Sequence, residues 1–127
     1  MTDEQATGSI CWTDLTVENA DSIRDFYSEV VGWQSSAIKM GDYEDYCMNE
    51  PESGQTVAGI CHARGANANI PPQWLVYMTV ADLDQSVARC QELGGEVLNG
   101  PRSVGDGTMV VIRDPAGAVA GLYQRNQ

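Results

Sequence analysis

Few side chains in this sequence have the type and spacing that catalysis needs. The chain has one histidine, His62, and a serine–histidine–acid arrangement cannot be argued from it. The best acid–base pair is Asp14 as the base with Tyr77 or Tyr46 as the acid. Asp14 is equally well explained as a structural hydrogen-bond acceptor. The weak catalytic candidates are therefore Asp14 and Tyr77, and no complete catalytic set is predicted.

Other side chains are better suited to binding a small molecule than to transforming it. Trp12 and Tyr123 could stack on a flat or apolar ligand, although plain core or cavity lining also explains such aromatic residues. Arg113 could pair with a carboxylate or a phosphate, but it precedes Asp114 at a turn, which favours a surface ion pair. These residue types are typical of a pocket with apolar walls and few polar groups.

The four cysteines carry little functional signal. Their positions are Cys11, Cys47, Cys61 and Cys90, with no closely spaced pair. This spacing favours small buried side chains in a reducing compartment over a zinc site, which needs local clusters of Cys and His. Cys61 could act as a nucleophile only if a base activated it, and no histidine is clearly placed to do so.

Composition and charge exclude several classes of function. The 127 residues carry 18 acidic and 7 basic side chains, a net charge of −11. Such a field repels phosphate backbones, so we expect no nucleic-acid partner. The chain has no apolar run long enough to span a bilayer and no basic start followed by an apolar stretch. We therefore expect a cytoplasmic protein that does not bind membranes.

The sequence contains an internal duplication. Leu15–Val17 aligns with Met78–Val80, and Val57–Cys61 aligns with Val119–Tyr123 at nearly the same offset. Chance similarity rarely keeps its register over half a chain, so the pattern indicates two copies of one supersecondary unit.

Each copy is predicted to form a strand, a helix and three further strands. Apolar side chains recur at helical spacing after each first strand; they are Ile23, Phe26, Tyr27, Val30 and Val31 in one copy and Leu83, Val87, Cys90 and Leu93 in the other. Asn19 and Gly32 are suited to cap the first helix; Asp82 with Gln85 resembles a capping box, and Gly94–Gly95 ends the second helix. The expected strands are 10–17, 33–39, 43–49 and 56–62, then 74–80, 96–98, 108–113 and 118–124.

Several motifs in this order resemble the vicinal oxygen chelate superfamily, which includes glyoxalases, bleomycin-resistance proteins and extradiol dioxygenases. The motifs are Phe26-Tyr27, Val31-Gly32-Trp33, the strand Trp74 to Val80 with Ala81-Asp82-Leu83-Asp84, Glu92-Leu93-Gly94-Gly95, and Asp114-Pro115-Ala116-Gly117. The resemblance implies an α+β fold: two βαβββ modules in one domain, with mixed sheets curved around a shared cavity and helices outside. We place this domain at 8–126, with module one at about 9–63, a linker at about 64–72 and module two at about 73–125.

Strand alternation assigns side chains to the two faces of this fold. Leu15, Val17, Val76, Met78 and Val80 should face the helices, and His62 should face the helices or solvent. The opposite parity faces the cavity, and Tyr46 and Met48 are expected to contribute from the middle of module one. The predicted ligand-binding residues are Trp12, Asp14, Tyr46, Met48, Gly59, Cys61, Leu75, Tyr77, Arg113, Gly121 and Tyr123.

The resemblance also implies where metal-dependent members hold a divalent ion, on the first and last strands of each module. Carried over position by position, those ligands fall on Trp12, Gly59, Leu75 and Gly121. None of these side chains can donate to a metal. We therefore expect no metal ligand and no cofactor.

Three functions remain open. The favoured hypothesis is a metal-free module that binds a small, partly aromatic or apolar molecule, as bleomycin-resistance proteins sequester a drug. The alternatives are a glyoxalase-like lyase or isomerase, which would use acid–base residues or an unrecognised metal, and an interaction subunit with a vestigial pocket. An extradiol dioxygenase has less support, because iron needs histidine and carboxylate ligands. The resemblance further implies a homodimer.

Overall fold

The computed structural model describes residues 6–126, which divide into two compact units. One unit is Thr13–Trp74, called here the first module; the other combines the chain up to Trp12 with the chain from Leu75 onward, called here the second module. The start of β1 (Ile10–Val17) thus belongs with the second module by its contacts. Each module is described by itself.

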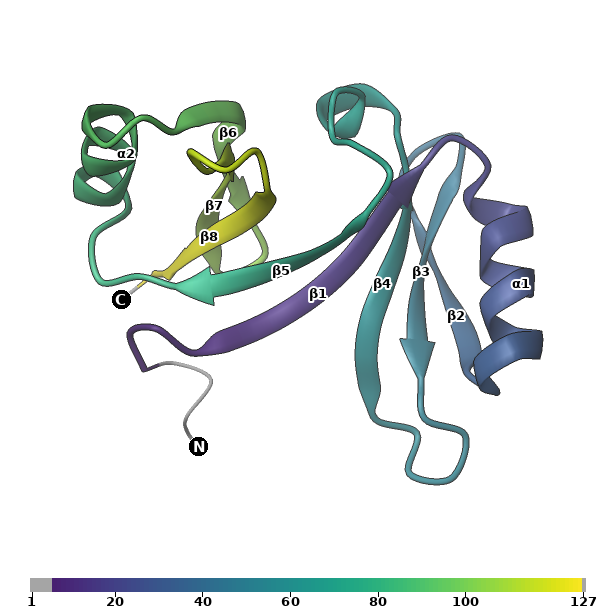
Figure 1. Ribbon diagram of the computed structural model, residues 1–127. Helices are drawn as coiled ribbons and strands as arrows, with labels where there is room; N and C mark the ends of the chain where they lie inside the picture. Colours follow the sequence, from purple (N-terminus) through teal and green to yellow (C-terminus); the bar gives the residue numbers. More distant parts are fainter. Residues whose placement is uncertain (1–5, 127) are drawn as a thin grey trace. The chain divides into compact units, whose positions relative to one another are not determined.

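The first module is a mixed sheet with one helix on one face. The chain runs through β1, α1 (Ala20–Val31), β2 (Gln34–Lys39), β3 (Glu44–Asn49) and β4 (Thr56–His62). Its strands lie in the order β2-β3-β4-β1, with β1 parallel to β4 and the other pairs antiparallel. In Figure 1, α1 lies alongside β2, β3 and β4. The core beneath the helix consists of Ala20, Tyr46, Met48, Ala58 and Ile60.

The second module repeats this arrangement. Its elements are β5 (Trp74–Thr79), α2 (Leu83–Glu92), β6 (Glu96–Val104), β7 (Gly107–Arg113) and β8 (Val119–Arg125). The strand order is β5-β8-β7-β6, and β5 pairs with β8 in parallel. Leu83 from α2 packs on Val110 and Leu122 to form the core. The order βαβββ, twice, and the α+β class are confirmed.

The helices begin where the sequence predicts, but their capping differs. Asp82 accepts a hydrogen bond from the Gln85 backbone N–H at 3.1 Å, so α2 has the side-chain cap expected of it. Asn19 occupies the N-cap of α1 without a side-chain cap bond, since its amide donates to the Ser22 hydroxyl instead. Gly32 ends α1 at a φ of 93°, a left-handed conformation that glycine adopts without a steric penalty.

Strand β6 is longer than the sequence predicted. The expected strand ended at Leu98, because Asn99-Gly100-Pro101 is typical of a turn. The observed strand continues to Val104, and its register with β7 shifts between Val97 and Asn99 and again between Asn99 and Arg102. An edge strand can accept such irregularities and a proline, which explains why it continues.

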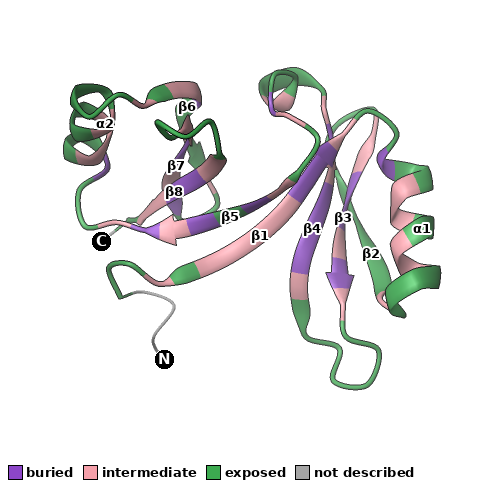
Figure 2. Cartoon of the chain, in the orientation of Figure 1, coloured by how far each residue is buried: buried purple, intermediate pink, exposed green. Residues whose placement is uncertain are grey.

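The apolar stripe of α1 is only half buried. Ile23 and Tyr27 pack on the core of the first module, as the helical spacing predicted. Phe26, Val30 and Val31 are 52%, 63% and 53% exposed. Figure 2 shows the same contrast between the inner and outer sides of α1. Between residues 6 and 126, no helix is both long enough and apolar enough to cross a membrane.

Candidate functional site

The face of the first module that lies opposite α1 carries one group of predicted site residues. Asp14 pairs with Gly59, and Thr16 pairs with Cys61, across the parallel strands β1 and β4. Paired residues of neighbouring strands share a face, so these four lie together, opposite Ile60 and the helix. These pairings agree with the alternation expected from the sequence for β1 and β4. We call this surface, and its counterpart in the second module, the helix-free face.

The second module places the other predicted residues on its own helix-free face. Tyr77 pairs with Gly121, and Thr79 pairs with Tyr123. Arg113 lies on the same face through its pairing with Val119. Leu75 follows the same alternation and is fully buried. Met78 and Val80 pack toward α2, as predicted.

The Tyr77 ring covers Gly121. A Cβ atom built on Gly121 would lie 2.1 Å from Tyr77 Cδ2 and 2.3 Å from Cε2, far inside van der Waals contact. The ring therefore occupies the space that any side chain at position 121 would enter. A protein side chain therefore lies directly against the backbone at this position.

Tyr123 is held by the turn between β6 and β7. Its hydroxyl donates a hydrogen bond to Asp106, and its ring lies so close to Gly107 that a Cβ there would be 2.4 Å from Tyr123 Cζ. Burial, followed by the hydrogen bond to Asp106, raises the pKa of Tyr123 to about 12. The same bond holds the pKa of Asp106 below its usual value. Tyr123 is therefore an uncharged, oriented phenol at ordinary pH.

Arg113 and Trp12 are the two remaining predicted residues of this module. The Arg113 guanidinium pairs with Glu96, the surface ion pair that the sequence favoured over ligand binding. Trp12, from β1, is half-buried.

Tyr46 and Met48 lie on the opposite face from the one expected. Tyr46 pairs with Ile60 and Met48 with Ala58, so both point toward α1 and belong to its core. The sequence could not fix the register of β3, and a shift of one residue inverts a strand's two faces. Tyr46 therefore cannot serve as the acid partner of Asp14, which lies on the other side of the sheet.

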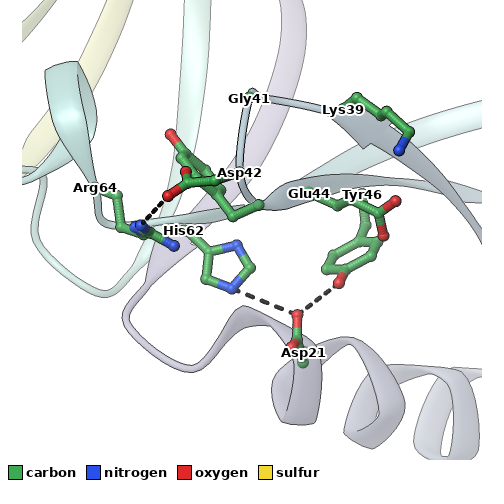
Figure 3. Close-up of a pocket in the computed structure, with 9 residues that line it drawn as sticks. Asp21, Lys39, Gly41, Asp42, Glu44, Tyr46, His62 and Arg64 are labelled. Carbon is green, nitrogen blue, oxygen red and sulfur yellow. Dashed lines mark hydrogen bonds and ion pairs between the residues drawn. The ribbon is translucent and has the colours of Figure 1, made fainter.

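A polar hollow of about 510 Å³ opens on the helix side of the first module (Figure 3). Asp21 from the first turn of α1 and His62 from the end of β4 line it, together with side chains from the end of β2 through β3. The remaining lining residues are Lys39, Gly41, Asp42, Tyr43, Glu44, Tyr46 and Arg64.

A connected group of titratable side chains forms the floor of this hollow. The Tyr46 hydroxyl donates to Asp21 Oδ1 at 2.5 Å, and His62 Nε2 lies 3.4 Å from the same oxygen. His62 Nδ1 lies 3.4 Å from Asp45 Oδ1, which also accepts the His62 backbone N–H at 2.8 Å. In Figure 3, His62 and Tyr46 both point toward Asp21. The hydrogen bond to Asp21, followed by burial, raises the pKa of Tyr46 to about 12.

Cations already lie on the tyrosine rings of this region. The Arg64 guanidinium carbon lies 4.2 Å from the centroid of the Tyr43 ring, and that of Arg24 lies 4.5 Å from the Tyr46 ring. Arg64 also pairs with Asp42 at 3.6 Å. Cation–π contact of this kind is favourable, and it is stronger where water is excluded.

Of the residues that line this hollow, only Tyr46 was among the predicted ligand-binding residues. For His62 the sequence left the helix side or solvent open, and its contact with Asp21 places it on the helix side. The signal that could have found the site is the alternation of acidic and aromatic residues in Asp42-Tyr43-Glu44-Asp45-Tyr46. Within residues 6–126, no group of three or more His, Cys, Asp or Glu side chains is arranged to hold a metal ion.

Comparison with known proteins identifies the family. The family model of the Glyoxalase/Bleomycin resistance protein/Dioxygenase superfamily matches residues 9–120. The chain belongs to this superfamily. Relatives include the glyoxylase-like protein CFP32 of Mycobacterium tuberculosis, 32% identical over 98% of this chain and 48% of its own length. The anthracycline biosynthesis protein DnrV of Streptomyces peucetius is 30% identical over 87% of this chain and 39% of its own length. The chain thus spans about half the length of the curated relatives it matches, or less.

Solved structures agree on the fold of this superfamily member. Methylmalonyl-CoA epimerase from Mycobacterium tuberculosis superposes with a TM-score of 0.55 at 17% identity, over 96% of this chain and 93% of the epimerase. A glyoxalase/bleomycin resistance protein/dioxygenase superfamily member from Vibrio splendidus gives 0.54 at 13% identity, over 89% and 96% of the two chains. At these identities the likeness establishes the fold, and activity has to be argued from side chains.

Proposed function

We propose that this superfamily member binds a small, partly aromatic or apolar molecule on its helix-free faces without a divalent metal. The observation that carries the proposal is the Tyr77 ring over Gly121. It places an aromatic surface where the resemblance puts a metal ligand.

The residues at the implied metal positions do not fit a metal ion. Trp12, Gly59, Leu75 and Gly121 offer no oxygen, sulfur or imidazole donor from their side chains. A carboxylate introduced at position 121 would have to displace Tyr77. No catalytic step is therefore assigned to a metal here.

An aromatic ligand suits the groups that remain. In the second module Trp12, Tyr77 and Tyr123 supply aromatic surface, and Arg113 supplies polar atoms for orientation. Two of the relatives are named for anthracycline biosynthesis, and anthracyclines are flat fused-ring molecules. Flat polycyclic aromatic molecules are therefore the first ligands to test.

The test is a thermal-shift screen with fused-ring aromatic compounds, with and without added Ni²⁺ or Zn²⁺. We expect an aromatic compound to raise the melting temperature whether or not metal is present. Trp12→Ala should abolish this rise, whereas Leu93→Ala, which removes an exposed apolar side chain at the end of α2, should leave it unchanged. A rise that requires metal, or that survives Trp12→Ala, would contradict the proposal.

The similarity to a glyoxylase-like protein favours a second candidate, a lyase or isomerase acting on a hemithioacetal. Such an enzyme would use acid–base groups of this chain, with Asp14 as the predicted base. Turnover of a hemithioacetal by the purified chain, lost in Asp14→Asn, would support it. Binding without turnover supports the first candidate.

We also propose that the chain forms a homodimer in the cytoplasm. Phe26, Val30 and Val31 expose apolar surface on one helix, and contiguous apolar surface of this kind often marks a protein interface. Light scattering should give twice the monomer mass, and Val30→Glu should reduce it toward that of the monomer.

A further inference from the structure

We propose that the polar hollow of the first module binds a small organic cation of the guanidinium class. This site lies on the helix side of the sheet, so it is distinct from the helix-free faces that carry the proposed function. The two sites can therefore be tested independently.

The charge of the hollow favours a cation. Asp21, Asp42 and Glu44 bring three carboxylates to the lining, against the two permanent cations of Lys39 and Arg64. The chain as a whole carries a net charge of −11, which raises the local concentration of cations around it. A volume of about 510 Å³ is within the range of small-molecule sites.

The structure itself shows that this region accepts a guanidinium. Two of them, from Arg64 and Arg24, lie on the faces of Tyr43 and Tyr46. A guanidinium is flat and weakly hydrated, so it stacks on an aromatic ring more readily than an ammonium group does. Both guanidinium groups also pair with a carboxylate, Arg64 with Asp42 and Arg24 with Asp25, so charge and aromatic stacking favour the same class of ligand.

Arg64 acts as an internal competitor for the site. Its pair with Asp42 spans 3.6 Å, and the two side chains are 48% and 83% exposed. Exposed pairs of this kind contribute little free energy, so Arg64 can leave Tyr43 and Asp42 at small cost. A ligand guanidinium would then take over both contacts.

The side chains around Asp21 are held in place before a ligand guanidinium replaces that of Arg64. His62 and Asp45 are 9% and 5% exposed, and His62 lies between Asp45 and Asp21. The hydrogen bond from Tyr46 fixes Asp21 from the other side. A charged partner can therefore bind without reordering the carboxylate that faces it.

The experiment is calorimetric titration of the full chain with butylguanidinium at low ionic strength. Butylurea is the neutral control, because it has nearly the same shape and no charge. We expect butylguanidinium to bind and butylurea not to bind. Equal binding of the two compounds, or binding of neither, would overturn the proposal.

Two pairs of variants separate a site from general electrostatics. Asp42→Asn should weaken binding about fivefold, whereas Glu52→Gln, an exposed acidic residue outside the hollow, should not. Arg64→Gln should tighten binding about threefold relative to Arg89→Gln, which removes the same charge from α2 in the second module. If Arg64→Gln binds no more tightly than Arg89→Gln, or if both acidic variants weaken binding equally, the hollow is not the site.

Discussion

The two modules use the same strand-to-helix contact with different chemistry. In the first module His62, at the end of β4, contacts the Asp21 carboxylate in the first turn of α1. In the second module Gln124, near the end of β8, accepts a hydrogen bond at 2.6 Å from the Leu83 backbone N–H, where α2 begins. His62 and Gln124 occupy corresponding strand positions in the internal repeat, so this position contacts the start of the helix through an ionisable side chain in one copy and a neutral one in the other.

This difference shows how duplication permits specialisation. The neutral contact of the second module satisfies a helix N-terminus and requires nothing further. The ionisable contact of the first module gathers Tyr46 and Asp45 around His62 beside a hollow. The frame supplies stability in both copies, while the polar hollow is formed by side chains of the first module.

The largest effect is expected at Gly121, where the Tyr77 ring fills the space beside the glycine. Gly121→Glu should lower the free energy of unfolding by about 1–3 kcal/mol, because the new side chain overlaps the Tyr77 ring. Urea unfolding measures this cost. The same change in a Tyr77→Ala background should cost much less. Equal costs in both backgrounds would show that the ring does not fill the space.

Replacing His62 with glutamine gives the first module the side chain that the second module has at the corresponding strand position, Gln124. His62→Gln should lower the free energy of unfolding by about 1–2 kcal/mol, since Asp21 and the buried Asp45 lose the imidazole between them. Gln124→Ala should cost about 1 kcal/mol by leaving the Leu83 N–H without its acceptor. Chemical denaturation measures the free energy of unfolding of both variants. A smaller loss for His62→Gln than for Gln124→Ala would contradict the expected order.

The helix caps offer a smaller contrast. Asp82→Ala should destabilise the protein by about 1 kcal/mol, because α2 loses its side-chain cap. Asn19→Ala should cost only about 0.3 kcal/mol, since Asn19 makes no cap bond. Thermal unfolding of the two variants, side by side, measures the difference. A larger loss for Asn19→Ala would contradict the assigned capping.

The smallest effect is a difference in tyrosine titration. The pKa of both Tyr46 and Tyr123 is raised to about 12, mainly by the hydrogen bond to Asp21 in the first case and mainly by burial in the second. Asp21→Asn should therefore lower the pKa of its tyrosine more than Asp106→Asn does. Absorbance of the phenolate against pH gives both shifts, and an equal response would show that burial governs both.

The same shifts set the sign of a pH effect on stability. A pKa raised in the folded state means that the fold holds the phenol proton more tightly than the unfolded chain does. The two tyrosines thus contribute their full stabilisation below pH 10, and this contribution is lost as the pH rises toward 12. Asp21→Asn and Asp106→Asn should each reduce the loss of stability between pH 10 and pH 12.

The fold could be predicted from the sequence because strands, helices and side-chain alternation are indicated by residues that are close together in the chain. Leu15–Val17 and Met78–Val80 are strands in both copies, and parity alone placed Asp14 with Gly59 and Tyr77 with Gly121 on shared faces. The register of β3 was not accessible, because its residues lack clear alternation. Tyr46 and Met48 were therefore placed on the wrong face.

The candidate site was only partly accessible, for a different reason. Whether a tyrosine ring covers a glycine depends on a side-chain rotamer, which the sequence does not specify. The polar hollow depends on residues far apart in the chain, from Asp21 to Arg64, that meet only after folding. The cavity enclosed by both modules, the single-domain boundaries and the role of Cys61 stay predictions.

The most direct test of the account is metal retention by the untagged protein. The protein is dialysed against Ni²⁺, Zn²⁺, Mn²⁺ and Fe²⁺ in turn, passed through a desalting column and analysed for metal by mass spectrometry. If the positions at Trp12, Gly59, Leu75 and Gly121 provide no ligands, each metal should remain far below one ion per chain. One tightly held ion per chain, lost when Asp14 is changed to Asn, would contradict the account.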